Sequence, residues 1–441
     1  MKSIKEKLNT KITDEDAKKL VSKIFAYVLF TFPLIPEVIG FGVYSLKNTL
    51  FNAWTIIISI IMLLLSYKDK VKLNIYEKIL GIYLILVVLS CFLSRYGLTS
   101  TILGINGRGE GLITILSYVI TFIIFSRNYK QMKGILKYGI IVATIVSIYG
   151  ILQVLLPNGT NLYIIPDITG NIAKGTMKNQ NMFSSYLCLF FPMICYYYIN
   201  SKNKLSIIPA CLMFVSLIFS KTLGGYLTCL GMYSIISIYS IVISKDKKKI
   251  ILKIILLTLL FIMLYFGINA IKHDIYSSEF KMTTEEVHKL ANNDESFGTG
   301  RMQIWQKGIS IIKNNPMFGV GPDNMAYELE CNMDKYKIFK DKDILAKYRI
   351  DKAHLEYMQI AVTTGIPSMI CIIIFQLLVV AGMLKKVVGS KENEVYAMVL
   401  ISITSYIIQS FANISVVQVA PIFWAMLGVG TSIILDKDEV N

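Results

Sequence analysis

The chain has 441 residues, of which 54% are apolar and only 17% are charged, and its mean hydropathy is +0.57. Soluble globular proteins carry about 25% charged residues, so this composition excludes soluble Rossmann or barrel enzymes and predicts a polytopic membrane protein. The formal net charge of +16 would suit nucleic acid. In a membrane protein, however, the positive excess belongs first to the cytoplasmic loops. We therefore expect a lipid bilayer as partner and no nucleic acid.

The apolar runs predict the fold class directly. A helix needs about 20 mainly apolar residues to cross the hydrocarbon core, and the chain offers about twelve such runs. We therefore expect an all-α polytopic membrane protein with about 12 transmembrane helices. The runs are 21–43, 51–67, 79–94, 111–126, 134–156, 181–199, 206–221, 222–243, 250–270, 356–384, 395–412 and 416–435. The pair 206–221 and 222–243 could also be one broken helix, because only a short polar segment around Lys221 separates its halves.

The distribution of Lys and Arg predicts the orientation. With the amino terminus inside, every inner loop is basic and the short outer loops hold few cations, as the positive-inside rule requires. Both termini are then cytoplasmic, in a multi-pass protein of the cytoplasmic membrane. The predicted organisation is transmembrane helices in 1–270, an extracytoplasmic loop domain in 271–355, and transmembrane helices in 356–441.

The long outer loop has the sequence of a small, mostly helical domain. Residues 302–314 predict a helix, and Asn315-Pro316 ends it, because proline disfavours helical conformation in the residue before it. The apolar side of this helix is expected to carry Ile304, Trp305, Gly308, Ile309 and Ile312. Further along, Gly319-Val320-Gly321-Pro322-Asp323-Asn324 predicts a tight turn rather than a phosphate-binding loop, because Pro322 and a missing glycine spoil the latter pattern.

Two residues near the edges of this loop have the chemistry of a catalytic site. His354 lies where the loop re-enters the membrane, and its ordinary pKa suits proton transfer near neutrality. The alternative is an imidazole that only packs at a helix start. Arg301 follows Gly298 and Gly300 and opens the loop helix, where backbone amides and a guanidinium can bind phosphate. The alternative there is a solvated surface arginine.

Three further cations, Lys221, Arg108 and Lys178, fall on the predicted outer face, where cations are few. Lys221 either reaches the outer interface or faces a cavity. No cysteine pair has metal-ligand spacing, and six of the seven cysteines lie in apolar runs. We therefore expect no metal site.

Several motifs taken together resemble the O-antigen ligase and polymerase superfamily, which comprises bacterial polytopic glycosyltransferases acting on undecaprenyl-pyrophosphate-linked sugars. The motifs are Gly175-Thr176-Met177-Lys178-Asn179-Gln180-Asn181, Ser220-Lys221-Thr222-Leu223-Gly224-Gly225, Gly300-Arg301-Met302-Gln303-Ile304-Trp305, Asn315-Pro316 to Asp323-Asn324, His354-Leu355-Glu356-Tyr357-Met358-Gln359 and Thr364-Gly365-Ile366-Pro367. Two positions depart from the family pattern. Lys221 stands in place of an arginine and loses its bidentate fork, and Leu355 stands in place of an asparagine.

The resemblance implies a mechanism and a set of site residues. His354 would accept the proton of the incoming sugar hydroxyl, and Arg301 would stabilise the negative charge that grows on the leaving pyrophosphate. Single displacement would invert the anomeric centre. Because pyrophosphate is already a good leaving group, we expect neither a metal nor another cofactor. The expected substrate-binding residues are Lys221, Arg108, Lys178, Asn181, Asn324 and Glu356.

Three functions remain open from the sequence. The first is a polymerase that joins lipid-linked repeat units into a capsule-like polysaccharide, with a flippase and a chain-length regulator as partners. The second is a ligase that moves a lipid-linked glycan to another acceptor, such as a lipid core, a teichoic-type polymer or a protein. The third is a flippase or other transporter of lipid-linked oligosaccharide. Frequent Lys, Ile and Asn indicate an AT-rich genome, as in a Gram-positive bacterium that lacks lipopolysaccharide. Because such a cell has no lipid core as acceptor, this favours the polymerase.

Overall fold

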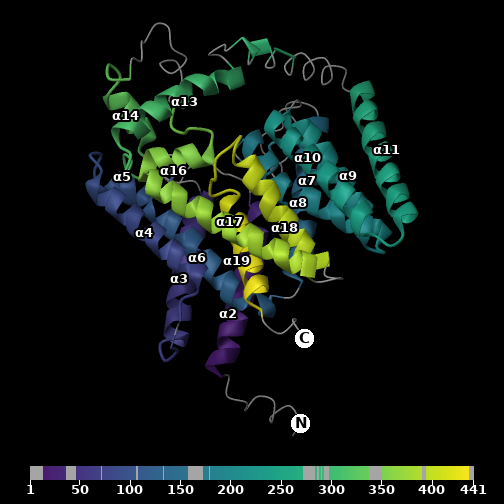
Figure 1. Cartoon of the computed structure of the whole chain (residues 1–441), viewed down its shortest axis with the longest axis horizontal. Helices are drawn as coiled ribbons and strands as arrows, with labels where there is room; N and C mark the ends of the chain where they lie inside the picture. Colours follow the sequence, from purple (N-terminus) through teal and green to yellow (C-terminus); the bar gives the residue numbers. More distant parts are fainter. Residues whose placement is uncertain are drawn as a thin grey trace.

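The structure is a computed structural model that describes residues 13–35, 46–70, 72–105, 108–132, 134–156, 172–177, 179–271, 284–285, 288–289, 291–292, 297–336, 350–389 and 394–436. All regular secondary structure in these residues is helical (Figure 1), which confirms the predicted all-α class. Within the described residues, seven helices are long and apolar enough to cross a membrane, and four shorter apolar helices accompany them. The predicted number of twelve spans, the orientation and the three-part division of the chain stay predictions.

The first part of the chain forms a series of helices up to the long loop. They are α2 (Asp14–Thr31) with η1 (Phe32–Leu34), α3 (Leu46–Leu65), α4 (Ile75–Leu93), α5 (Leu98–Leu103), α6 (Leu112–Asn128) with η2 (Tyr129–Gln131), α7 (Ile135–Leu155), α8 (Gln180–Asn200), η3 (Lys204–Ser206), α9 (Ile207–Ser220), α10 (Leu223–Ile243) and α11 (Lys247–Ile271). The second part contains α13 (Phe297–Asn314), α14 (Met325–Cys331), α16 (Glu356–Thr364), α17 (Ile366–Gly389), α18 (Glu394–Gln409) and α19 (Ala420–Leu435).

Residues with positive φ separate neighbouring helices at two places, one where two spans were predicted and one where a single span was predicted. Residues 206–243 form two helices, because Lys221 adopts a left-handed φ of 50° between α9 and α10. The predicted span 356–384 is also divided, at Gly365 with φ 94°, into α16 and α17. A side chain at Gly365 would place its Cβ 2.1 Å from the carbonyl oxygen of Met317. Only glycine therefore allows the chain to pass this close to the turn that follows α13.

The core of the molecule surrounds α8. In the stretch of this helix that is long enough to cross a membrane, 94% of the residues are buried. The helix packs against α9, α10, α18 and α7. A helix that is apolar on all sides is buried either in a protein core or in lipid. The helix α8 is buried in protein, with Phe and Tyr side chains such as Phe183, Tyr186 and Phe190 inside the core. The helix α11 lies at the edge of the bundle beside α9 and α10 (Figure 1). Its exposed Leu252 and Phe266 suit contact with lipid.

The helices of the outer loop form a second core of their own. α13 and α14 lie at the end of the molecule opposite the start of α2 and the end of α19 (Figure 1). Ile304, Ile311, Val320 and Met325 are buried together there. The predicted end of the helix at Asn314 is confirmed, but the predicted apolar side is partly wrong. Ile309 is 46% exposed, because the buried stripe follows residues 304, 308 and 311 at the helical period.

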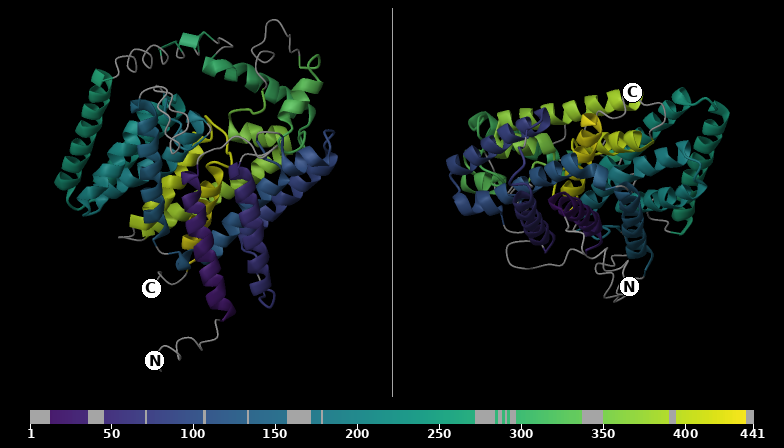
Figure 2. Two further views of the ribbon diagram at one scale, coloured as in Figure 1. Left: turned by 180° about the vertical axis from the view of Figure 1, so that it is seen from behind. Right: turned by 90° about the horizontal axis from the view of Figure 1, so that it is seen from below.

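Several loops that the charge pattern assigns to the cytoplasm meet at the other end of the molecule. α2 and α3 run side by side toward this end (Figure 2). Lys18 on α2 pairs with Asp69 after α3 at 2.6 Å. Lys130 after α6 pairs with Asp436 after α19 at 2.8 Å, and Lys386 donates to the carbonyl oxygen of Asp436. The basic loops are therefore gathered on one end, away from α13 and α14.

Candidate functional site

The loop between α18 and α19, residues 410–419, is the point at which distant parts of the chain meet; we call it the central loop. Glu356 at the start of α16 donates its backbone N–H to Ser410 O at 3.0 Å and accepts from the backbone N–H of Ser415 at 2.5 Å. Arg301 on α13 donates from Nη1 to Ala412 O at 2.7 Å. The central loop therefore holds the start of α16 and the arginine of the outer loop in one place.

The central loop also contacts three segments from the first part of the chain. The backbone N–H of Val417 donates to Glu110 Oε1 at 2.8 Å, so the loop before α6 is fixed to it. Asn413 donates from Nδ2 to the carbonyl oxygen of Asn181 at 2.9 Å, which fixes the first turn of α8. A side chain at Gly224 would lie 3.0 Å from the Ala412 side chain. The first turn of α10 therefore reaches the residue that also receives Arg301.

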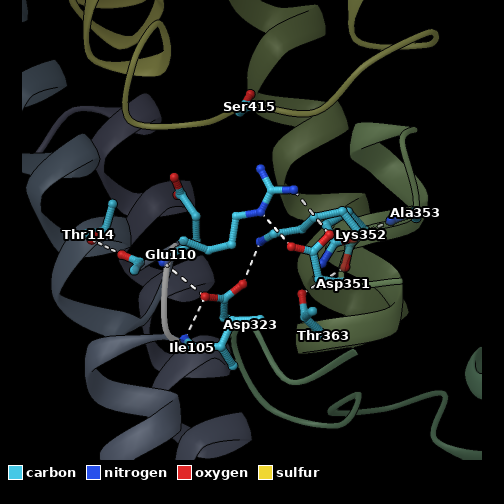
Figure 3. Close-up of polar contacts among 12 residues, drawn as sticks. Ile105, Glu110, Thr114, Asp323, Asp351, Lys352, Ala353, Thr363 and Ser415 are labelled. Atoms are coloured by element: carbon cyan, nitrogen blue, oxygen red, sulfur yellow. Dashed lines mark hydrogen bonds and ion pairs between the residues drawn. The ribbon is translucent and has the colours of Figure 1, made fainter. Parts of the chain in front are cut away.

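A buried ion pair joins the end of the outer loop to the turn before α14. Lys352 Nζ lies 2.5 Å from Asp323 Oδ1, and the two side chains are 3% and 0% exposed (Figure 3). Asp323 Oδ2 also accepts from the backbone N–H groups of Ile105 at 2.8 Å and Glu110 at 3.1 Å. Burial alone would lower the pKa of Lys352, but the charges of Asp323 and Glu110 raise it above its ordinary value. Lys352 is therefore charged at neutral pH.

A second ion pair lies directly beside the first. Arg108 binds Asp351 at two points, with Nε 2.5 Å from Oδ2 and Nη2 3.1 Å from Oδ1. This is the two-point geometry that guanidinium and carboxylate favour. Burial works toward a higher pKa of Asp351, but the hydrogen bonds and charge of Arg108 lower it below its ordinary value. Arg108 was predicted to bind substrate, and that role stays a prediction; the structure adds that two of its nitrogens are engaged with Asp351.

His354 follows these two pairs and has an unusual environment. Its φ is 51°, in the left-handed region that non-glycine residues rarely adopt. Its Nδ1 is buried and has no hydrogen-bond partner among the described residues. Burial and then the positive charge of Arg301 lower the pKa of His354 to about 4. The imidazole is therefore neutral at pH 7 and close enough to Arg301 to be affected by its charge. Its Nδ1 is not engaged by any of the described residues.

A cavity of about 80 Å³ lies beside Asp323 and Lys352 and is lined by both polar and apolar side chains. By volume it holds about two or three water molecules. Gln359 lines it, accepts from the backbone N–H of Ala353 at 2.7 Å, and leaves its Nε2 without a partner among the described residues. The other polar side chains at its wall are Glu110, Tyr118, Asp323, Lys352, Glu356, Thr363, Thr364, Gln376 and Ser415. No group of three or more His, Cys, Asp or Glu in the described part of the chain is placed to hold a metal.

The remaining predicted residues lie in different places. Lys221 lies between α9 and α10 and three residues before the Gly224 that touches the central loop. Lys178 lies outside the described residues. Asn181 takes part through its backbone, while Asn179 caps α8 by accepting from the N–H of Asn181 at 2.7 Å. The substrate-binding roles of these residues stay predictions.

Asn324 and Glu356 have structural partners. Asn324 is fully buried and donates from Nδ2 to Ser94 Oγ at 3.1 Å, so it supports the turn before α14. The adjacent Asp323 is the residue that faces the ion pairs. Glu356 bonds to the central loop and makes no hydrogen bond with His354. Substrate contacts by either residue stay predictions.

The glycine-rich segment before Asp323 is a tight turn, as predicted. Gly319 and Gly321 have φ of 63° and 102°. The N–H of Val320 donates to Val362 O at 3.0 Å, and that of Gly321 donates to Thr363 O at 2.8 Å. These amides bind the end of α16, which leaves them occupied rather than aimed at a phosphate.

The comparison with known families agrees with the placement of these residues. Residues 208–373 match the family model described as O-antigen ligase (Wzy_C). This segment runs from α9 into α17 and contains Lys221, Arg301, Asp323 and His354. No curated protein matches the chain. Residues 208–373 of this multi-pass membrane protein therefore belong to the O-antigen ligase family, and the resemblance read from the motifs is confirmed.

Proposed function

We propose that the chain is a membrane glycosyltransferase that joins undecaprenyl-pyrophosphate-linked oligosaccharide repeat units into a surface polysaccharide. The observation that carries the proposal is the convergence of a neutral imidazole, His354, and the guanidinium of Arg301. Their segments are held on one central loop although they are far apart in the sequence. This pair supplies the two groups that glycosyl transfer from a pyrophosphate requires.

The reaction is a single displacement. The acceptor hydroxyl attacks the anomeric carbon of the donor glycan, and its proton passes to the imidazole of His354. At the same time the bond between the anomeric carbon and the pyrophosphate oxygen breaks, and polyprenyl pyrophosphate leaves. Attack from the face opposite the leaving group inverts the anomeric centre. General-base assistance of this kind contributes typically about 10²–10⁴-fold in rate.

The cations act on the leaving group. Negative charge grows on the bridging oxygen as the bond breaks, and a positioned guanidinium stabilises that charge more in the transition state than in the ground state. Arg301 fills this role. Lys221 binds the phosphates, and Arg108 and Lys178 contribute to the same binding. The chemistry needs no metal, because the pyrophosphate leaves readily once its charge is stabilised.

The proposed setting is the outer face of the cytoplasmic membrane. The basic loops gathered around Lys130 and Lys386 would face the cytoplasm under the positive-inside rule. Both termini then lie in the cytoplasm, and α13, α14 and His354 lie outside. A flippase that delivers the donor and a chain-length regulator are the proposed partners.

A ligase is the second candidate, because the matched family is described as O-antigen ligase. It shares the donor chemistry and differs only in the acceptor. Purified protein in lipid nanodiscs, supplied with a synthetic lipid-linked repeat unit, distinguishes the candidates. A ladder of products supports the polymerase. Transfer only to an added foreign acceptor supports the ligase, and the absence of any new glycosidic bond contradicts both and favours a transporter.

A further inference from the structure

The three residues before His354, residues 351–353, are each held by specific contacts with distant parts of the chain. Asp351 is gripped by Arg108 at 2.5 and 3.1 Å. Lys352 is paired with Asp323 at 2.5 Å, with both side chains buried. These two pairs attach two adjacent residues of one short stretch of backbone to the rest of the protein.

The next residue, Ala353, is fixed through its backbone on both sides. Its N–H donates to Gln359 Oε1 at 2.7 Å, and its carbonyl oxygen accepts from Trp305 Nε1 at 3.0 Å. Trp305 belongs to α13, which also carries Arg301. Every residue from 351 to 353 therefore has a specific partner, whereas the His354 side chain has no hydrogen-bond partner among the described residues.

Two residues of this arrangement have strained backbones. His354 and Asp323 are both in the left-handed region, with φ of 51° and 62°. Non-glycine residues occupy this region at a cost and persist there only when the surroundings hold them. A buried ion pair also adds little to the free energy of unfolding, because the cost of removing two charges from water offsets much of their mutual attraction. A stretch with one buried pair, one partly buried pair and two residues in the left-handed region therefore gains little stability from them, which points to a function for its geometry.

We infer that the pairs Lys352–Asp323 and Arg108–Asp351 form a positioning clamp that fixes the backbone of His354 and aims its imidazole toward Arg301. Lys352, Asp323 and Asp351 are then positioning residues, which act through His354 and do not contact the substrate. The inference rests on the proposed function, because the imidazole needs aiming only if it acts on a substrate.

The clamp reaches the membrane helices through Asp323. Its Oδ2 is bonded to the backbone of Ile105 and Glu110, which lie in the segment between α5 and α6. The end of the outer loop is thus attached to this segment, and the position of His354 is set relative to the membrane helices as well as to α13. Loss of the clamp would leave His354 in place along the chain but free to turn.

The imidazole itself can report on the clamp. The chain has three histidines, so replacing His273 and His288 by Asn leaves His354 as the single imidazole. With ¹⁵N-labelled histidine, NMR of this protein in nanodiscs observes one side chain. The charged groups that act on it are Arg301 on α13, Arg108 before α6, and Asp351 and Lys352 in its own segment.

The test compares three variants of the single-histidine protein. Asp323→Asn/Lys352→Met removes both charges of the pair and keeps an oxygen to accept from the backbone of Ile105. Lys352→Arg keeps the charge, and Lys335→Met removes an exposed cation elsewhere in the outer loop as a control. The unmodified clamp should give one set of imidazole signals, and Lys352→Arg and Lys335→Met should keep it. The double variant should give several sets or motionally averaged signals.

Activity gives the second readout. With a synthetic lipid-linked repeat, the double variant should lose about 10–100-fold in kcat while the donor KM changes less than about threefold, as expected for misplacement of a catalytic group. Folding is checked by the melting temperature in detergent. A folded double variant with one unchanged set of imidazole signals, or with unchanged kcat, would overturn the clamp. If the wild-type chain forms no glycosidic bond, the proposed function fails, while the NMR comparison still shows whether the clamp holds His354.

Discussion

The dependence of the rate on pH gives a quantitative test of His354 as the base. Burial of the imidazole and the positive charge of Arg301 lower its pKa to about 4, from an ordinary value near 6.5. A general base must be neutral, so activity is lost as the pH falls through the pKa. Because kcat/KM reports the free enzyme, the acid limb of its pH profile should lie near pH 4 and not near pH 6.5.

The size of the effect follows from the two pKa values. At about pH 5.5, an imidazole with the ordinary pKa would be about 10% neutral, whereas one with a pKa of about 4 is about 97% neutral. The two cases therefore differ roughly tenfold in kcat/KM at that pH. Bound pyrophosphate brings negative charge next to Arg301, which offsets the repulsion on the imidazolium. The acid limb of kcat should consequently lie at higher pH than that of kcat/KM.

The assay measures initial rates of glycosidic bond formation at subsaturating and saturating lipid-linked donor, from about pH 3.5 to 8, a range that includes the pKa of about 4 expected for His354. Burial raises the pKa of Glu110 to about 7, so the profile is repeated in Glu110→Gln to remove that titration. A tenfold fall of kcat/KM between pH 7 and about 5.5 in both proteins would refute the assignment of a lowered pKa to His354.

Four further predictions concern other parts of the structure. Because the pKa of Glu110 is raised, its contribution to the free energy of unfolding is greatest below the pKa of the unfolded chain, near 4.5, and is lost as the pH rises through about 7. Glu110→Gln should remove this loss of about 1–3 kcal/mol. An unchanged difference in melting temperature between pH 5 and pH 8 would count against this prediction. Gly365→Ala combines left-handed φ with a clash and should destabilise by about 2–5 kcal/mol, whereas Gly97→Ala, with φ 84° and open space around it, should cost about 1–2 kcal/mol; equal melting temperatures would contradict this. Arg301→Gln should lower kcat/KM about 10²–10³-fold and Arg301→Lys about tenfold, and a fully active glutamine variant would exclude its charge from the mechanism. Lys221→Arg should keep activity while Lys221→Met loses at least about tenfold, so equal rates for the two variants would remove Lys221 from the site.

The fold was predictable from the sequence where a strong local signal exists. Apolar runs located the helices, and Asn315-Pro316 marked the end of α13, because these features depend on residues close together in the chain. The divided span at Gly365 was not predicted. Its cause is a close approach to Met317, and such long-range contacts leave no periodic signal in one sequence.

The candidate site was predictable only in part, for a similar reason. Arg301, Asp323 and His354 all lie in motifs, but neither Asp323 nor Lys352 was predicted to take part in the site. Their pairing, and that of Arg108 with Asp351 across 243 positions, arises only in the folded chain. The central loop, residues 410–419, contains no charged side chain, so its contacts with Arg301 and the other segments gave no sequence signal at all.

The most direct measurement is the rate of glycosidic bond formation by purified His354→Ala on a lipid-linked repeat unit, beside wild type and a His288→Ala control. His288 is an exposed residue of the outer loop, so its variant should react at the wild-type rate. If His354 is the general base, His354→Ala should keep the wild-type melting temperature and lose at least about 10²-fold in kcat. A folded His354→Ala protein that forms product at the wild-type rate would contradict the account.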